Sequence, residues 1–190
     1  PGLATTNVFR ERFQREAMAM TRVSHACLLK VFDVGVAGEL PFIAMELVPG
    51  RTLEAAIRES PVEVRRRADA LFPQILEAVA VMHAKGLTHR DLKPGNVMVT
   101  PDWQPVVMDL GLVKDYSGDG TVLTRTGALL GTPAFLAPEV LGGGVPASAR
   151  SDVWALGCIY FHLHAGRQPF ESESLPQLYQ AIMEVELPDL

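Results

Sequence analysis

Apolar residues recur every three or four positions in several stretches of this chain, a spacing that places them on one face of an α-helix. The pattern predicts a helix over about 6–23, a longer one over about 61–85 and a last amphipathic helix over about 175–185. A short helix is expected over 53–58. Residues 152–165 are apolar nearly all round, which predicts a helix buried on every side.

The start of the long helix carries a capping signature. Ser60 precedes Pro61, which suits the first helical position, and Glu63 follows three residues after Ser60. We therefore expect a capping box between Ser60 and Glu63. The run Arg65–Arg67 on the same helix is interpreted as a solvated face rather than a patch that binds a partner.

Runs rich in β-branched and aromatic residues predict strands between these helices. Residues 28–36 and 40–48, separated by Ala37-Gly38-Glu39, predict a β-hairpin. Residues 97–99 and 106–108 predict a second pair of strands. The polar stretch 114–131, rich in Gly and Thr, predicts a long loop. The chain is therefore expected to be of the α+β class.

Composition narrows the range of functions. Apolar residues make up 48 % of the 190 residues, which excludes a disordered chain. The net charge of −5 argues against a nucleic-acid partner. No apolar run approaches the ~20 residues that span a bilayer, so we expect a cytoplasmic domain, with any membrane anchor outside this chain. Two cysteines, Cys27 and Cys158, are expected to be reduced, and His25, His83, His162 and His164 to be structural.

Three motifs carry candidate chemistry. His89-Arg90-Asp91-Leu92-Lys93-Pro94-Gly95-Asn96 comes first, Asp109-Leu110-Gly111 begins 18 residues after Asp91, and Ala137-Pro138-Glu139 ends 30 residues after Asp109. A carboxylate and an amide oxygen on adjacent strands suit a hard cation such as Mg²⁺, and a second carboxylate can take a proton from an attacking hydroxyl. Each motif alone is also compatible with an ordinary turn or helix start.

In this order and spacing, the motifs resemble those of the eukaryotic-type serine/threonine protein kinase family, in its bacterial form. The resemblance covers the whole chain. It implies a two-lobed kinase-like fold, with a partial N-lobe over 1–48 and a mostly helical C-lobe over 49–190. It also implies transfer of the γ-phosphoryl group of ATP, with Mg²⁺, to Ser or Thr hydroxyls of a protein substrate.

The resemblance assigns roles to individual residues. It makes Asp91 the catalytic base, Lys93 the mark of Ser/Thr specificity, and Asn96 and Asp109 the Mg²⁺ ligands, and it makes Glu16 the glutamate of the regulatory helix. The residues that match the nucleotide pocket are Met45, Glu46, Val48 and Met98.

Further positions match the family's structural and regulatory residues. Asp152 is expected to anchor the Asp91 loop through the backbone amides of His89 and Arg90. Arg90 is expected to pair with a phosphorylated threonine of the 114–131 loop, and the candidate phosphorylation sites are Thr124 and Thr126. Thr132 is the threonine expected to face the substrate.

The family's Gly-rich loop and ATP-binding lysine should precede the Glu16 helix, and neither occurs in these 190 residues. We therefore expect a chain truncated at both ends that is inactive alone. Two alternatives stay open: a pseudokinase-like binding module and a small-molecule phosphotransferase of the same fold. The intact Asp91, Lys93, Asn96 and Asp109 favour a kinase over the first. The Arg90-type motif and the Ala-Pro-Glu segment favour it over the second.

Overall fold

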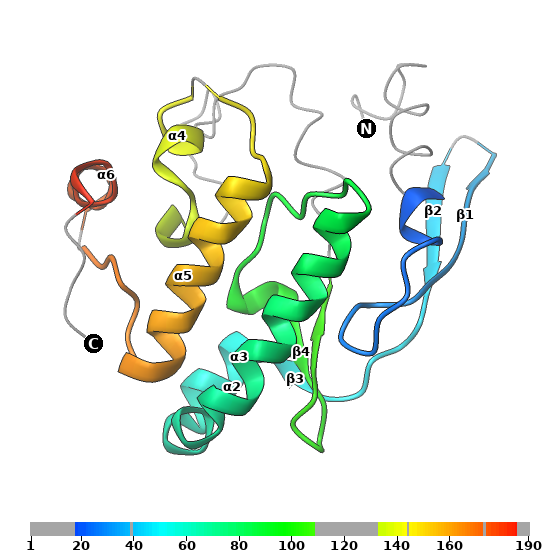
Figure 1. The fold of residues 1–190 in the computed structure, drawn as a ribbon, viewed down its shortest axis with the longest axis horizontal. Helices are drawn as coiled ribbons and strands as arrows, with labels where there is room; N and C mark the ends of the chain where they lie inside the picture. The colour runs from blue at the N-terminus through cyan, green and yellow to red at the C-terminus, as the bar shows by residue number, and fades with distance from the viewer. Residues whose placement is uncertain (1–17, 39, 109–132, 144, 173, 186–190) are drawn as a thin grey trace.

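The computed structural model describes residues 18–38, 40–108, 133–143, 145–172 and 174–185 (Figure 1). Its elements run, in chain order, β1 (Val31–Ala37), β2 (Leu40–Met45), β3 (Arg51–Thr52), α2 (Leu53–Glu59), α3 (Pro61–Ala84), η1 (Pro94–Asn96), β4 (Val97–Val99), β5 (Pro105–Val107), η3 (Pro133–Phe135), α4 (Pro138–Leu141), α5 (Ala149–Ala165) and α6 (Leu175–Glu184). The mixture confirms the expected α+β class. Most of the predicted 6–23 helix lies outside the described residues. Within the part of that range that is described, residues 18–20 are helical. The predicted 114–131 loop also lies outside the described residues.

The predicted hairpin is confirmed, with shorter strands. β1 and β2 pair antiparallel, with Val34 opposite Ile43 and Gly35 opposite Phe42. Gly38, at the turn, has a φ of 64°, which glycine adopts without a steric penalty. The Phe42 ring covers Gly35 so closely that a Cβ there would lie 2.6 Å from ring carbons. In Figure 1 this hairpin stands at one side of the molecule.

The second predicted strand pair is confirmed as β4 and β5, which belong to a three-stranded antiparallel sheet in the order β3-β4-β5. Thr52 pairs with Met98, and Val97 pairs with Val107. Leu28, just before β1, makes a parallel bridge to Val107, and the Leu29 amide donates to the Val107 carbonyl at 2.9 Å. The segment that leads into the hairpin is therefore tied to the sheet that carries the candidate motifs.

The core lies between α3 and α5, which pack against each other (Figure 1). The inward side chains of α3 follow the predicted spacing and are Val64, Ala68, Leu71, Ile75, Ala78, Val79 and Met82. α5 buries most of its surface, including Ile159 and Leu163 at 0 % exposure. The expectation of burial on every side is wrong for one narrow face, where Val153 and Tyr160 are exposed. Because these residues are seven apart, they share one face of the helix.

The predicted capping box at the start of α3 is not formed. Ser60 does occupy the N-cap position and Pro61 the first helical position, but no side-chain cap bond is made. The Ser60 hydroxyl instead accepts a hydrogen bond from Arg51 at 3.1 Å. The Glu63 carboxylate binds Arg66 at 2.7 Å and Arg67 at 2.5 Å. Ion pairing on the helix surface therefore replaces the backbone contacts that the sequence pattern predicted.

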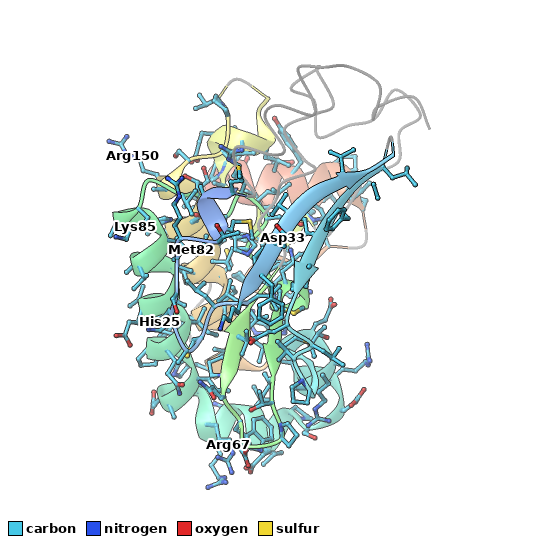
Figure 2. All side chains as sticks on the ribbon, turned by 90° about the vertical axis from the view of Figure 1, so that its right-hand side faces the viewer. His25, Asp33, Arg67, Met82, Lys85 and Arg150 are labelled. Carbon is cyan, nitrogen blue, oxygen red and sulfur yellow. The ribbon has the colours of Figure 1, made fainter. Side chains whose placement is uncertain are left out.

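The arginine run agrees with the solvated-face interpretation. The Arg66 and Arg67 guanidiniums hold the pKa of Glu63 down to about 2. Arg67 also lies over the Trp103 ring, 5.0 Å from its centroid. Figure 2 places Arg67 at the end of the molecule far from Lys85, the residue that follows α3. Among the described helices, none is long and apolar enough to cross a membrane.

Candidate active site

A buried carboxylate at the start of α5 holds the loop that contains Asp91. Asp152 is 1 % exposed, and it accepts hydrogen bonds from the backbone amides of His89 at 2.8 Å and Arg90 at 2.9 Å. This confirms the predicted anchor. A third donor, His83 on α3, lies 2.8 Å from the same carboxylate. A buried charge is tolerated when it is fully hydrogen-bonded, and the first turn of a helix also favours a negative group.

The anchored loop has an unusual backbone conformation. Arg90 has a φ of 67°, in the left-handed region that costs a non-glycine residue free energy. The Arg90 amide is one of the two that Asp152 accepts, so this buried carboxylate helps to fix the conformation. The turn presents Asp91 immediately after it. The strained residue and the candidate base are therefore adjacent, as is common where a side chain must be held in one orientation.

His89 connects this loop to the end of β5. Its ring is fully buried, with Nε2 2.8 Å from the Met108 carbonyl oxygen and Nδ1 accepting the Asp91 amide at 3.3 Å. A carbonyl oxygen only accepts, so Nε2 carries the proton and Nδ1 is the acceptor. His89 is thus a neutral imidazole that links the candidate base to the residue directly before Asp109. The sequence pattern left His89 without a separate role.

The side chains around Asp91 form a compact polar group. The Lys93 ammonium donates to Asp91 Oδ2 at 3.2 Å. The Asn96 side-chain amide donates to the Asp91 carbonyl at 2.7 Å and to its Oδ2 at 3.1 Å. The side chains of Asp91 and Lys93 keep 17 % and 22 % of their surface exposed. The structure therefore brings Asp91, Lys93 and Asn96 together, as the sequence predicts, and leaves the carboxylate accessible.

Of the two predicted Mg²⁺ ligands, Asn96 and Asp109, only Asn96 lies in the described part of the chain. Because the Asn96 side-chain nitrogen is used by Asp91, its amide oxygen is the atom available to a ligand. The Met108 amide donates to the Asn96 carbonyl at 2.9 Å, which ties the residue after β5 to Asn96. Asp109 itself lies outside the described residues, among which no group of three His, Cys, Asp or Glu side chains could hold a metal. Carboxylate and amide oxygens are ligands that Mg²⁺ accepts.

A cavity adjoins Asp91. Arg90, Asp91 and Lys93 line it together with the apolar side chains of Phe135, Leu136 and Val140. Phe135 belongs to η3, which packs against α5. The lining of the cavity therefore combines charged side chains of the Asp91 loop with apolar side chains of the segment that contains η3 and α4.

The residues predicted to border a nucleotide make no side-chain hydrogen bond with the polar group around Asp91 in the described part of the chain. Met45 is the last residue of β2 and is 43 % exposed. The backbone amide of Glu46 donates a hydrogen bond to the Lys30 carbonyl at 2.9 Å. Val48 and Met98 are half-buried, and Met98 follows η1 in β4. Their contact with a nucleotide stays a prediction. The predicted roles of Glu16, Asp109, Thr124, Thr126 and Thr132 fall on residues outside the described part of the chain.

The third motif has a partner that sequence reasoning missed. The Ser151 hydroxyl donates to Glu139 Oε1 at 3.2 Å and accepts from the Ser148 amide at 2.9 Å. Ser148 and Ser151 form a capping box at the start of α5. The spacing Ser-x-x-Ser before an apolar helix was the available signal. The contact fixes α4 relative to the helix that anchors the Asp91 loop.

Comparison with known proteins agrees with this arrangement. Residues 4–188 match the model of the protein kinase domain family. The chain is 38 % identical over 187 residues to the probable serine/threonine-protein kinase PknB of Corynebacterium glutamicum, covering 96 % of this chain and 29 % of that protein. It is 34 % identical over 191 residues to the serine/threonine-protein kinase PknB of Mycobacterium tuberculosis, covering 98 % and 30 %. For the serine/threonine-protein kinase PksC of Streptomyces coelicolor the identity is 39 % over 181 residues, covering 90 % and 32 %. The chain thus spans less than a third of the length of these curated relatives.

Proposed function

The chain belongs to the protein kinase family, and on this premise we propose that residues 89–96 are the catalytic loop of a serine/threonine kinase. Its reaction transfers the γ-phosphoryl group of ATP to a Ser or Thr hydroxyl of a protein substrate. The observation that carries the proposal is the set of contacts at Asp91, whose Oδ2 lies 3.2 Å from the Lys93 ammonium and 3.1 Å from the Asn96 amide.

Each group has a defined part in the proposed reaction. The substrate hydroxyl oxygen attacks the γ-phosphorus, and its proton passes to the Asp91 carboxylate. The bond from the γ-phosphorus to the bridging oxygen breaks, and ADP leaves with the electron pair. Lys93 places a positive charge beside the transferred group. Mg²⁺, when bound, neutralises phosphate charge, and Asn96 and Asp109 are the residues that would hold it.

The rigidity of the loop supports this assignment. Phosphoryl transfer depends mainly on positioning and charge stabilisation, because the protein supplies little covalent chemistry. Asp152 and His89 fix the backbone on both sides of Arg90 through one buried and two partly buried hydrogen bonds. Such bonds lose most of their competition from water, so they restrict the position of Asp91. An ordinary surface turn has no need of this support.

The remaining roles complete the proposal. Glu16 of the regulatory helix would pair with the family's ATP-binding lysine, which contacts the phosphates. The residues that would border the adenine ring are Met45, Glu46, Val48 and Met98, and Thr132 would face the substrate hydroxyl. Phosphorylation of Thr124 or Thr126 would create a partner for Arg90. Residues 1–48 would belong to the N-lobe and 49–190 to the C-lobe. The cytoplasm, where ATP is abundant, is the proposed location.

The test uses protein expressed from the longest reading frame that contains this chain. The purified protein is incubated with γ-³²P-labelled ATP and Mg²⁺, in parallel with mixed protein substrates and with mixed small metabolites. We expect label in protein, and after acid hydrolysis in phosphoserine and phosphothreonine only. Label in metabolites alone would point to a small-molecule phosphotransferase. Nucleotide binding without any transfer would point to a pseudokinase. Either result would overturn the proposal.

A further inference from the structure

Two consecutive residues at the start of α5, Ser151 and Asp152, line the cavity beside Asp91. The Asp152 carboxylate holds the Asp91 loop through two backbone amides. Ser151 is only 7 % exposed, so it is a polar residue that needs hydrogen-bond partners within the protein. The rest of the lining comes from the Asp91 loop, from the segment 133–141, which contains η3 and α4, and from two alanines.

The Ser151 hydroxyl makes two hydrogen bonds with different parts of the chain. It accepts from the Ser148 backbone amide at 2.9 Å, which is one half of the capping box of α5. It donates to Glu139 Oε1 at 3.2 Å. Because a hydroxyl carries one proton, the bond to Glu139 uses the only proton that Ser151 can offer. The same side chain therefore caps α5 and connects it to α4.

The segment 133–141 has little regular structure to hold it in place. α4 has four residues, and no side chain caps its N-terminus. A helix this short is unstable by itself, so its position depends on contacts with other elements. One such contact is the stack of Phe135 in η3 on His162 of α5. Within the described residues, the bond between Ser151 and Glu139 is the one hydrogen bond that joins the segment to α5.

Adjacent residues of α5 thus hold the two segments that supply most of the cavity lining. Asp152 fixes the loop that contains Asp91. Ser151, through Glu139, fixes the segment 133–141. Because Ser151 and Asp152 are consecutive in one helix, their own separation does not vary. The position of one segment relative to the other therefore depends on the two sets of hydrogen bonds at the start of α5.

We infer that Ser151 is a positioning residue for the protein substrate. Through Glu139 it keeps the segment 133–141 in one position relative to Asp91, so the cavity has one shape when the substrate hydroxyl reaches the base. The inference rests on the proposed function, because it assigns the cavity beside Asp91 to the protein substrate. Ser151 acts through Glu139 and not on the reacting atoms, so it affects the binding of protein more than the chemical step.

The experiment measures kcat, KM for protein and KM for ATP with the full reading frame. Dephosphorylated β-casein and myelin basic protein serve as an acidic and a basic protein substrate. The variants are Ser151→Ala, Glu139→Leu and the double variant that combines them. Ser148→Ala is the matched control, because it removes the other hydroxyl of the capping box and leaves the bond between Ser151 and Glu139 in place.

We expect Ser151→Ala to raise KM for protein about three- to ten-fold, the effect of losing one hydrogen bond. KM for ATP should keep its wild-type value, and kcat should change less than KM for protein. Glu139→Leu should have the same effect, and the double variant should be no worse than Glu139→Leu alone, because both changes remove one bond. Ser148→Ala should lower the melting temperature through weaker capping, with KM for protein unchanged.

The inference is overturned if Ser151→Ala leaves KM for protein at its wild-type value. It is also overturned if Ser148→Ala raises this KM equally, because capping of α5 would then be the cause. An effect of Ser151→Ala in the Glu139→Leu background would overturn it as well, since Ser151 would then act by another route.

If Ser151→Ala does not fold, Glu139→Leu tests the same bond from an exposed residue, and an unchanged KM for protein in that variant overturns the inference. Failure of the proposed function looks different, because wild type then phosphorylates neither protein. That result would remove the premise and the inference together.

Discussion

At the scale of single residues, buried polar groups determine the geometry of the candidate site. The Asp152 carboxylate accepts hydrogen bonds from the backbone amides of His89 and Arg90 and from the His83 ring. The His89 ring, as a neutral tautomer, joins the Asp91 loop to the Met108 carbonyl. Each donor would cost free energy if it were buried without an acceptor. These hydrogen bonds therefore stabilise one conformation of the loop, including the left-handed Arg90. A change at any of them affects the position of Asp91 and not only stability.

The buried side chain of His162 leads to a prediction about how stability depends on pH. Burial lowers its pKa below the value of about 6.5 of an exposed histidine. The folded state then binds fewer protons than the unfolded state at acid pH, so stability falls as the pH drops below about 6.5. Above that pH the side chain is neutral in both states and contributes no pH dependence.

We expect His162→Phe to reduce this pH dependence while keeping the stack on Phe135. Urea unfolding at pH 7.5 and at pH 5.5 gives the free energy of unfolding for each variant. The difference between the two pH values should be smaller for His162→Phe than for wild type. An equal difference would show that burial of His162 does not contribute to acid destabilisation.

At the scale of elements, the sequence predicted most of the fold because hydrophobic periodicity reports burial directly. The hairpin, α2, α3, the β4–β5 pair, α5 and α6 all appear close to their predicted ranges. The predictions that failed concern competition between side chains. Glu63 binds Arg66 and Arg67 in place of the backbone, because the Ser60 amide already donates to the Ala56 carbonyl at 2.8 Å. Such competition depends on the geometry of the side chains, which a spacing rule does not contain.

In the candidate site too, contacts between residues close in sequence could be predicted, and contacts between distant residues could not. Asp91, Lys93 and Asn96 are close in sequence, so their proximity could be predicted. The approach of Glu54 to Gly95 joins residues 41 positions apart, and the contact of His83 with Asp152 joins residues 69 positions apart. A glutamate in a first helical turn is common and is usually explained by the helix dipole. Its proximity to the catalytic loop follows only from the packing of α2 on η1.

Helix capping gives a prediction at this scale. The Thr52 hydroxyl accepts the Ala55 amide at 3.1 Å and caps α2, whereas the Ser60 hydroxyl makes no cap bond to α3. Thr52→Ala should therefore lower the free energy of unfolding by about 1 kcal/mol. Ser60→Ala should change it by less than about 0.5 kcal/mol. Chemical denaturation measures both values, and a Ser60→Ala cost equal to that of Thr52→Ala would mean that α3 is capped in solution after all.

At the scale of the whole molecule, the proposed catalytic loop, residues 89–96, lies between α3 and β4 in the chain and is held by Asp152 of α5. The hairpin is connected to the three-stranded sheet through Leu28 and Val107, and η1 leads directly into β4 of that sheet. The helices α5 and α3 supply Asp152 and His83, respectively. This arrangement is that of the protein kinase family, to which residues 4–188 belong. The lobe boundary after residue 48 remains a prediction of the sequence.

The central claim is that Asp91 is the base of a phosphoryl-transfer reaction. The most direct measurement is kcat for phosphate transfer to protein by the full reading frame as wild type, Asp91→Asn and Asp102→Asn. Asp102 lies in the exposed turn between β4 and β5, so its variant controls for the loss of one charge. We predict that Asp91→Asn lowers kcat about 10²- to 10⁴-fold, with the melting temperature unchanged, and that Asp102→Asn keeps the wild-type rate. An Asp91→Asn variant as active as Asp102→Asn would contradict the account.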